Sequence, residues 1–260
     1  MSDLGMLNDM VARKRAEVET IRCGRAALWV KAEAMKPVHG MAGLRGGAVI
    51  AELKRRSPSG GELRPDLDVS ATARLYVTAG AAAISILTDS AFGGSPADLE
   101  AVRAAVDVPV LRKDFIVDPV QIAESRVLGA DWVLLIVAIL PGDALEACLA
   151  AATRAGLHAI VEVHDASEIA RALRVGAGCV GINNRDLRTL RTNLDTFASL
   201  RQLLPDGVIC IAESGVRDVG DARRLLDEGA DALLVGETLL RSDDPGAACA
   251  TLVAAVGTTA

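Results

Sequence analysis

The stretch GADWVLLIV at residues 129–137 places a glycine, an alanine and an aspartate directly before a run of apolar residues. The glycine follows an amphipathic helix pattern, at a place where a residue that tolerates left-handed backbone commonly ends a helix. The same Gly-Ala pair precedes apolar runs at residues 80–81, 176–177 and 229–230, about 50 residues apart each time. The stretch is therefore one copy of a helix-to-strand unit that repeats along the chain.

A second set of apolar runs lies between the first, so that eight short strands are expected. They lie at residues 48–51, 84–87, 108–111, 133–137, 158–162, 180–182, 208–211 and 233–235. Near-continuous apolar strands that alternate with helices indicate a parallel sheet covered on both faces. Eight such units in 260 residues predict an α/β fold, the (β/α)8 or TIM barrel, with a doubly wound open sheet as the alternative.

We expect residues 1–260 to form a single domain, because no linker composition divides the chain. The segment 1–47 is a helical N-terminal extension, helical over residues 4–36 with a break near Gly24, and the barrel occupies 48–260. The extension is expected to cap the barrel or to cover one of its ends.

The composition excludes several classes of protein. A net charge of −6 argues against a surface for nucleic acid, whose binding depends largely on neutralising phosphates. The longest apolar run, residues 132–140, reaches roughly half of the ~20 residues that a membrane span needs, and the N-terminus has no apolar signal core. Five scattered cysteines do not form a disulfide framework. We therefore expect a cytoplasmic protein that binds neither nucleic acid nor membranes.

Ionisable residues recur where the odd-numbered strands end. Glu52 and Lys54 follow the first, Lys113 the third, Glu162 the fifth and Glu213 the seventh. The carboxyl ends of barrel strands carry the chemistry, and period-two alternation turns these side chains toward the barrel interior. Lysines and carboxylates that meet in a dry barrel mouth shift one another's pKa values, which prepares general acids and bases.

The last two strands are followed by small residues suited to phosphate. Ser214 and Gly215 come after the seventh strand, and Gly236 and Glu237 after the eighth. Backbone N–H groups in these loops commonly bind phosphate in barrels of this kind. The alternative is that the glycines only shape turns.

Two tempting motifs are discounted. GAGCVG at residues 176–181 fits the dinucleotide-binding pattern, but it follows a helix and leads into a strand, the reverse of the required order. Glu162 and His164 share a strand face, but no third metal ligand has an evident place nearby. His39, His158 and His164 are interpreted as structural or surface residues.

Seven segments, in order between about residue 48 and residue 241, resemble the indole-3-glycerol phosphate synthase family of tryptophan biosynthesis. They are IAELKRRSPS, LRKDFIVDPVQI, GADWVLLIVAIL, VEVHD, GINNRDL, AESGV and LVGETLL. The helical extension resembles that of the family as well. The resemblance implies a carboxy-lyase that closes 1-(2-carboxyphenylamino)-1-deoxyribulose 5-phosphate to indole-3-glycerol phosphate, with loss of carbon dioxide and water and without a metal or organic cofactor.

The resemblance also implies catalytic roles. Lys113 is the general acid that protonates the ketone oxygen, and Glu162 is the base for dehydration, although accounts of the family divide the proton transfers between the two lysines differently. Lys54 pairs with the anthranilate carboxylate and can itself donate a proton. Glu52 orients Lys113 and stabilises cationic charge.

Further residues match the substrate-binding positions of the family. Phe115 corresponds to the apolar contact with the aromatic ring, and Asn183 and Arg185 to the polar pair after strand six. The remaining matches are Ser57, Ser214, Gly215, Leu234, Gly236 and Glu237, mostly on the phosphate side. Glu237 stands where some relatives have serine, so only its backbone N–H is a suitable donor to phosphate.

Other functions remain as alternatives. A different barrel that handles phosphosugars would be an isomerase, which needs no lysine for a carboxylate, or an aldolase, which would form a Schiff base on one lysine. A non-catalytic barrel subunit is a remote third reading. The expected partner is a phosphorylated, anionic small molecule. We expect a monomer, and the sequence leaves open an association with other enzymes of the tryptophan pathway.

Overall fold

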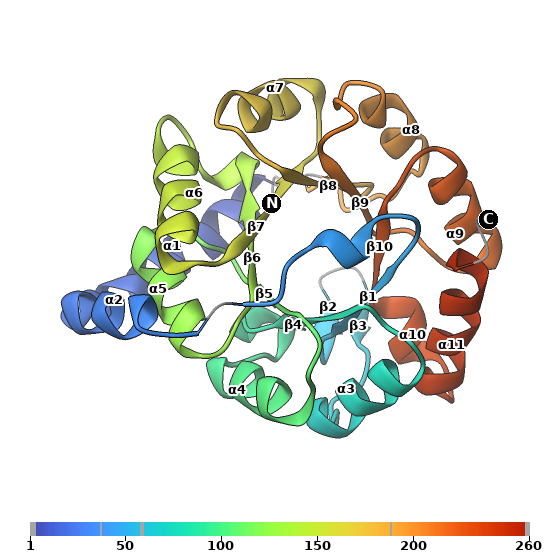
Figure 1. Ribbon diagram of the computed structural model, residues 1–260, viewed down its shortest axis with the longest axis horizontal. Helices are drawn as coiled ribbons and strands as arrows, with labels where there is room; N and C mark the ends of the chain where they lie inside the picture. The colour runs from blue at the N-terminus through green and yellow to red at the C-terminus, as the bar shows by residue number, and fades with distance from the viewer. Residues whose placement is uncertain (1–3, 37, 58–59, 188, 258–260) are drawn as a thin grey trace.

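Eight parallel strands close into a barrel, as predicted, and helices surround it (Figure 1). The computed structural model describes residues 4–36, 38–57, 60–187 and 189–257. The barrel strands are β1 (Val49–Leu53), β4 (Ala83–Leu87), β5 (Val110–Lys113), β6 (Trp132–Ile136), β7 (His158–Val163), β8 (Cys179–Asn183), β9 (Ile209–Glu213) and β10 (Ala232–Val235). Each pairs with its neighbours in chain order, and β10 pairs with β1 to close the barrel.

The helices follow the expected alternation. The outer ring consists of α3 (Val69–Thr78), α4 (Pro96–Ala105), α5 (Pro119–Val127), α6 (Ala144–Ala155), α7 (Ala166–Arg174), α8 (Asp195–Arg201), α9 (Val219–Asp227), α10 (Glu237–Arg241) and α11 (Pro245–Val256). Shorter elements are the 3₁₀ helices η1 (Ala42–Leu44), η2 (Ser90–Phe92) and η3 (Val137–Ile139) and the small hairpin of β2 (Arg56–Ser57) and β3 (Gly61–Glu62).

Two of the four Gly-Ala copies continue with an aspartate that joins the incoming strand to its neighbour. Gly129 has a φ of +96°, which reverses the chain after α5 at little cost for a residue without a side chain. Asp131 then accepts the backbone N–H of Val110 at 2.8 Å, and Asp231 accepts that of Cys210 at the same distance. The two aspartates thus supply acceptors to backbone donors near the start of the preceding strand.

The core explains the apolar strand pattern. All residues of β1, β4, β6 and β8 are buried, because side chains fill the barrel on one face of each strand and helices cover the other. Cys179 and Cys210 are buried as small apolar residues. Within the described part of the chain, no helix combines the length and the apolar character of a membrane span.

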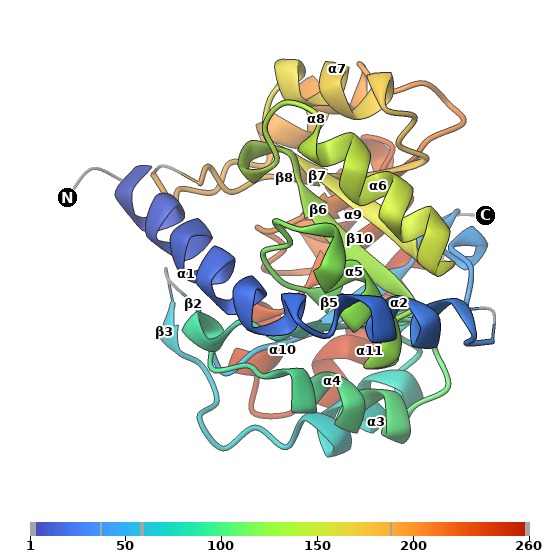
Figure 2. The same ribbon diagram turned by 90° about the vertical axis from the view of Figure 1, so that its left-hand side faces the viewer.

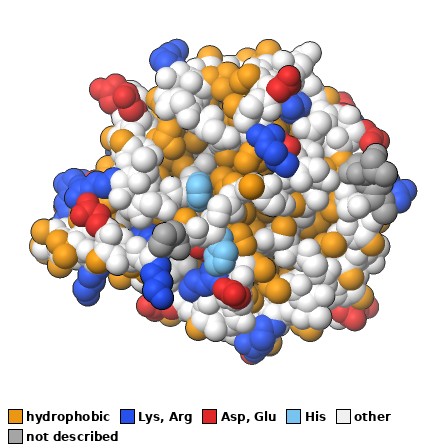
Figure 3. Space-filling model, in the orientation of Figure 1, with side chains coloured by type: hydrophobic (Ala, Val, Ile, Leu, Met, Phe, Trp, Pro, Cys, Tyr) orange, Lys and Arg blue, Asp and Glu red, His pale blue; other side chains and the backbone are white. Residues whose placement is uncertain are grey.

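The N-terminal extension reaches both ends of the barrel. It forms α1 (Leu4–Arg22) and α2 (Arg25–Glu33), with the break near Gly24 as predicted. Figure 2 shows the start of α1 at the left, on the same side of the molecule as the β2–β3 hairpin, whereas α2 lies further right. The following segment crosses the N-terminal ends of the strands, where Gly47 donates to Asp231, and buries Leu44 (Figure 1). On this face, side chains of both charges are interspersed (Figure 3).

Candidate active site

The end of β1 carries the first charged pair of the site. Glu52 is 3% exposed, and its Oε1 accepts a hydrogen bond from Nζ of Lys54 at 2.5 Å. Side chains two residues apart on a strand lie on the same face, so this pairing follows from the alternation. Glu52 therefore contacts Lys54, whereas the resemblance implied that it orients Lys113. Arg55 has the opposite parity and pairs with Asp98 outside the barrel.

Lys113 ends β5 and lies between two carboxylates. Its Nζ is 2.8 Å from Oε2 of Glu213 and 3.3 Å from Oε2 of Glu162. Burial alone would lower the pKa of Lys113, but the negative charges of Glu213, Glu162 and Glu52 outweigh burial and raise it. Lys113 is therefore fully protonated and can deliver a proton to a group that binds beside it.

Glu162 has three polar neighbours. Besides the contact with Lys113, Oε1 of Glu162 accepts a hydrogen bond from Nδ2 of Asn183 at 3.0 Å. The same oxygen lies 3.2 Å from Nε2 of His164, which is an ion pair when the ring is protonated. Burial would raise the pKa of Glu162, but the positive charge of Lys113, followed by that of His164, lowers it. Glu162 is consequently a carboxylate, ready to accept a proton.

His164 lies behind Glu162, a position that its interpretation as a structural or surface residue did not anticipate. Its Nδ1 is 3.1 Å from Oε2 of Glu168, so the ring stands between two carboxylates. Burial lowers the pKa of His164, but the contacts with Glu162 and Glu168 raise it to about 10. No third ligand joins them: among the described residues there is no cluster of His, Cys, Asp or Glu that could hold a metal.

Glu213 completes the charged centre. The sequence places it at the same end of the barrel as the other carboxylates, but no role was assigned to it. Burial is the largest cause that raises the pKa of Glu213, to about 7, and the charge of Glu162 adds to it, while Lys113 opposes the shift. A carboxyl group that is half protonated at neutral pH can both give and take a proton.

An apolar wall faces the charged centre. Phe115 follows Lys113 by two residues and lies with its ring centroid 6.2 Å from that of Phe92 in η2. Leu134 and Ile136 of β6 also line the cavity. The end of β6 carries no charge, so the sequence pattern predicted no site residue there. Only the structure shows that two apolar side chains of β6 line the cavity.

The polar pair after β8 shapes a neighbouring loop. The carboxamide oxygen of Asn183 accepts the backbone N–H of Arg185 at 3.0 Å, and the guanidinium of Arg185 donates to the carbonyl oxygen of Leu190 at 3.0 Å. Leu190 has a φ of +56°, a left-handed conformation that is uncommon outside glycine. Arg185 therefore holds a strained loop at the rim of the cavity.

The turns after β9 and β10 form the end of the cavity opposite that wall. Ser214 and Gly215 have φ values of +64° and +94°, and a Cβ on Gly236 would lie 2.6 Å from Oε1 of Glu52. A side chain at position 236 would therefore displace the carboxylate of Glu52. The helix α10 starts at Glu237 without a side-chain cap, so its first N–H groups are open to a ligand.

An ion pair and a hydrogen bond hold the Glu237 side chain at the same end of the cavity. It pairs with Nε of Arg241 at 2.9 Å, and Arg241 donates to the carbonyl oxygen of Gly60. Ser57 accepts the backbone N–H of Gly60 at 2.9 Å, so the β2–β3 hairpin is tied to α10. Residues 58–59 of the hairpin loop lie outside the described residues.

Every residue predicted for the site from the sequence lines one cavity of about 680 Å³ at the C-terminal ends of the strands. These are Glu52, Lys54, Ser57, Lys113, Phe115, Glu162, Asn183, Arg185, Ser214, Gly215, Leu234, Gly236 and Glu237. The lining also includes Leu7 and Met10 of α1, which the sequence did not single out. The cavity joins paired acids and bases to an apolar wall and to exposed backbone donors.

The chain is similar to proteins of known family. The family model described as indole-3-glycerol phosphate synthase matches residues 7–252. An indole-3-glycerol phosphate synthase of Kineococcus radiotolerans is 55% identical over 212 residues, which cover 81% of this chain and 77% of the relative. One from Mycobacterium avium is 48% identical over 261 residues, covering 98% and 96%. A thiamine phosphate pyrophosphorylase from Pyrococcus furiosus shares the fold alone, with a TM-score of 0.61, 18% identity and coverage of 82% and 96%.

Proposed function

The chain belongs to the indole-3-glycerol phosphate synthase family, and from this premise we propose how its barrel mouth closes the indole ring. It is a decarboxylating lyase that converts 1-(2-carboxyphenylamino)-1-deoxyribulose 5-phosphate to indole-3-glycerol phosphate, carbon dioxide and water. The observation that carries the assignment of roles is the convergence of Lys54, Lys113 and three buried carboxylates in one cavity. The cavity offers different chemistry to each end of this substrate.

The substrate binds with its two anionic ends apart. Its carboxylate pairs with Lys54, and its aromatic ring packs against Phe115. Its phosphate accepts hydrogen bonds from the backbone after β9 and β10, near Ser214 and Gly236. This placement bends the chain so that the ring carbon bearing the carboxylate meets the ketone carbon, and such positioning lowers the barrier to ring closure.

Ring closure uses Lys113 as the acid. The ring carbon attacks the ketone carbon, and the new alkoxide takes a proton from Nζ of Lys113, whose raised pKa keeps it protonated until the oxygen becomes basic. The carboxylate then leaves as carbon dioxide, and the electron pair of the broken bond restores the aromatic ring. Glu52, hydrogen-bonded to Lys54, holds that lysine near the departing carboxylate.

Dehydration uses Glu162 as the base. Its carboxylate removes a proton from the methylene carbon next to the nitrogen, while the hydroxyl group takes a proton from Lys54 and leaves as water. Once Lys113 has given up its proton, Glu162 has lost the main cause of its low pKa and becomes a stronger base. Ring closure thus prepares dehydration, because the acid of the first step, Lys113, and the base of the second, Glu162, form one ion pair.

The substitution Lys113→Ala tests this proposal. We expect turnover to fall by about 10³-fold, while the product still binds, because a general acid acts mainly in the transition state. Indole absorbance and fluorescence after addition of the substrate measure turnover, and Lys31→Ala on the exposed face of α2 is the matched control. Near-normal turnover of Lys113→Ala would refute its role as the acid.

The proposal extends to the oligomeric state of the enzyme and its location in the cell. A phosphorylated small molecule is the substrate of this family, and we propose that the enzyme works as a monomer in the cytoplasm, where the other steps of amino-acid synthesis take place. Size-exclusion chromatography with light scattering over a range of protein concentrations tests the oligomeric state.

A further inference from the structure

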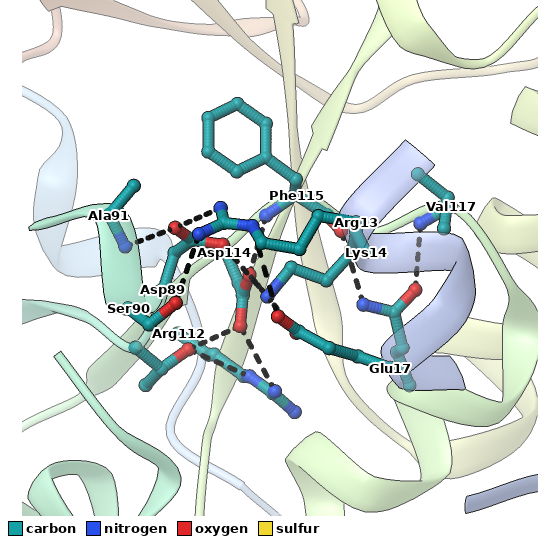
Figure 4. Close-up of polar contacts among 12 residues, drawn as sticks. Arg13, Lys14, Glu17, Asp89, Ser90, Ala91, Arg112, Asp114, Phe115 and Val117 are labelled. Carbon is teal, nitrogen blue, oxygen red and sulfur yellow. Dashed lines mark hydrogen bonds and ion pairs between the residues drawn. The ribbon is translucent and has the colours of Figure 1, made fainter. Parts of the chain in front are cut away.

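Lys14 is buried between α1 and the barrel, where it faces two aspartates (Figure 4). It is 4% exposed, and its Nζ lies 2.8 Å from Oδ2 of Asp89 and 2.8 Å from Oδ1 of Asp114. Asp89 follows β4 and Asp114 follows β5, directly after Lys113. A single side chain of α1 thus joins the C-terminal ends of two neighbouring strands.

Further ions surround Lys14: it also pairs with Glu17 of the same helix at 2.7 Å, and each aspartate has a second cation as its partner. Arg13 pairs with Asp89 at 2.6 Å, and Arg112 pairs with Asp114 at 3.1 Å. Burial would lower the pKa of Lys14, but the charge of Asp114 and hydrogen bonds to both aspartates raise it. Removal of these ions from water is expensive, and apolar contacts alone could attach a helix at lower cost. The cluster is better explained by the geometry that it imposes.

Both aspartates also hold aromatic residues of the cavity. Oδ1 of Asp89 accepts a backbone N–H of η2 at 2.8 Å, and η2 carries Phe92. Oδ1 of Asp114 accepts the backbone N–H of Phe115 at 2.8 Å. The two carboxylates that bind Lys14 therefore also fix the backbone from which the side chains of Phe92 and Phe115 extend.

The same helix adds side chains to the same wall. Met10 and Leu7 precede Lys14 by one and two helical turns and so lie on the same face of α1. Both line the cavity that contains Phe92 and Phe115. When Lys14 binds its two aspartates, this face of α1 comes to lie beside the aromatic rings.

We propose that Lys14 is a positioning residue for the aromatic half of the substrate, which fixes Phe92, Phe115 and the apolar face of α1 as one slot. This inference rests on the proposed function. Lys14 does not touch the reacting atoms, since its Nζ is bound to carboxylates outside the charged centre. Loss of Lys14 should therefore weaken the binding of ligands that enter the slot and leave unchanged the binding of ligands that contact only the phosphate end.

The test compares Lys14→Met with Arg15→Met, an exposed residue of the same helix. Competition in the turnover assay gives the inhibition constants of indole, which probes the slot, and of inorganic phosphate, which probes the other end. We expect Lys14→Met to weaken indole about tenfold and to raise KM, with the phosphate constant unchanged. Arg15→Met should behave as the unaltered chain. An equal loss for both probes, or no loss for indole, would overturn the proposal.

A second variant covers the case in which Lys14→Met does not fold. Met10→Ala keeps the ion cluster and shortens one side chain of the slot, so it should weaken indole and leave phosphate unchanged. An unchanged indole constant for Met10→Ala would overturn the proposal. Lys113→Ala separates the two ideas: in that variant turnover is lost by the proposed mechanism, but direct binding of indole, followed by calorimetry, should persist.

Discussion

Glu213 shares the barrel mouth with Glu52 and Glu162, so that three buried carboxylates meet two lysines. Its pKa is raised from 4.5 to about 7, which means that the folded state retains a proton that the unfolded chain releases. Stability is therefore lost as the pH rises from about 4.5 to about 7 and stays lower above that range. This loss is a consequence of burying Glu213 beside Glu162, and the charge of Lys113 offsets only part of it.

Substitution of Glu213 by glutamine should separate activity from stability. We expect turnover to fall by about 10 to 100-fold, because Lys113 loses its closest carboxylate, and the melting temperature at pH 8 to rise by a few degrees. In the unaltered enzyme, turnover should rise as the pH passes through about 7, because Glu213 ionises there. The pH–rate profile of the variant should lack this rising limb. Glu146→Gln on the exposed face of α6 is the control. A limb near pH 7 that survives in Glu213→Gln would assign it to another group.

At the scale of the elements, hydrogen bonds at the N-terminal ends of the strands join neighbouring strands. Asp231 precedes β10 and accepts the backbone N–H of Cys210 near the start of β9. We expect Asp231→Ala to lower the free energy of unfolding by about 1 to 3 kcal/mol, because a buried backbone donor loses its partner. Turnover should not change, since Asp231 lies at the end of the barrel opposite the cavity. Denaturant titration and the turnover assay measure both, with the exposed Asp227→Ala as control; a fall in turnover would contradict the separation of the two ends.

Sequence patterns predict the elements well because each is fixed locally. The apolar runs give all eight strands with ends displaced by at most a few residues, and alternation along β1 and β5 places Glu52, Lys54 and Lys113 inside. Contacts between distant elements were not predictable. The angle at which α1 docks decides whether Lys14 reaches Asp114, and no local pattern encodes that angle.

At the scale of the whole molecule, the extension holds the barrel at two ends. The helix α2 packs against α5 and α6, and α1 is attached beside the mouth through the cluster of Lys14, Asp89 and Asp114. Figure 2 shows the two helices spread along the barrel rather than stacked on one another. The attachment at the mouth depends on buried charges, whereas the ion pair of Glu33 in α2 with Arg154 in α6 is largely exposed, so acid should act mainly on the mouth.

Acid should weaken the attachment of α1 within a defined range. The pKa of Asp114 is lowered to about 2, mainly because Arg112 and Lys14 outweigh the effect of burial, so its contribution to stability is complete above about pH 4 and is lost as the pH falls toward about 2. Lys14 remains protonated throughout this range, because its pKa is raised. The whole shift of Asp114 is worth ~2 kcal/mol, and Arg112 still supplies part of it in Lys14→Met. We therefore expect the difference in unfolding free energy between the unaltered chain and Lys14→Met to shrink by about 1 kcal/mol between pH 5 and pH 2. Urea titrations at each pH measure it, and Arg15→Met should show no such trend. A difference that stays constant down to pH 2 would mean that Lys14 stabilises the fold by packing rather than by its charge.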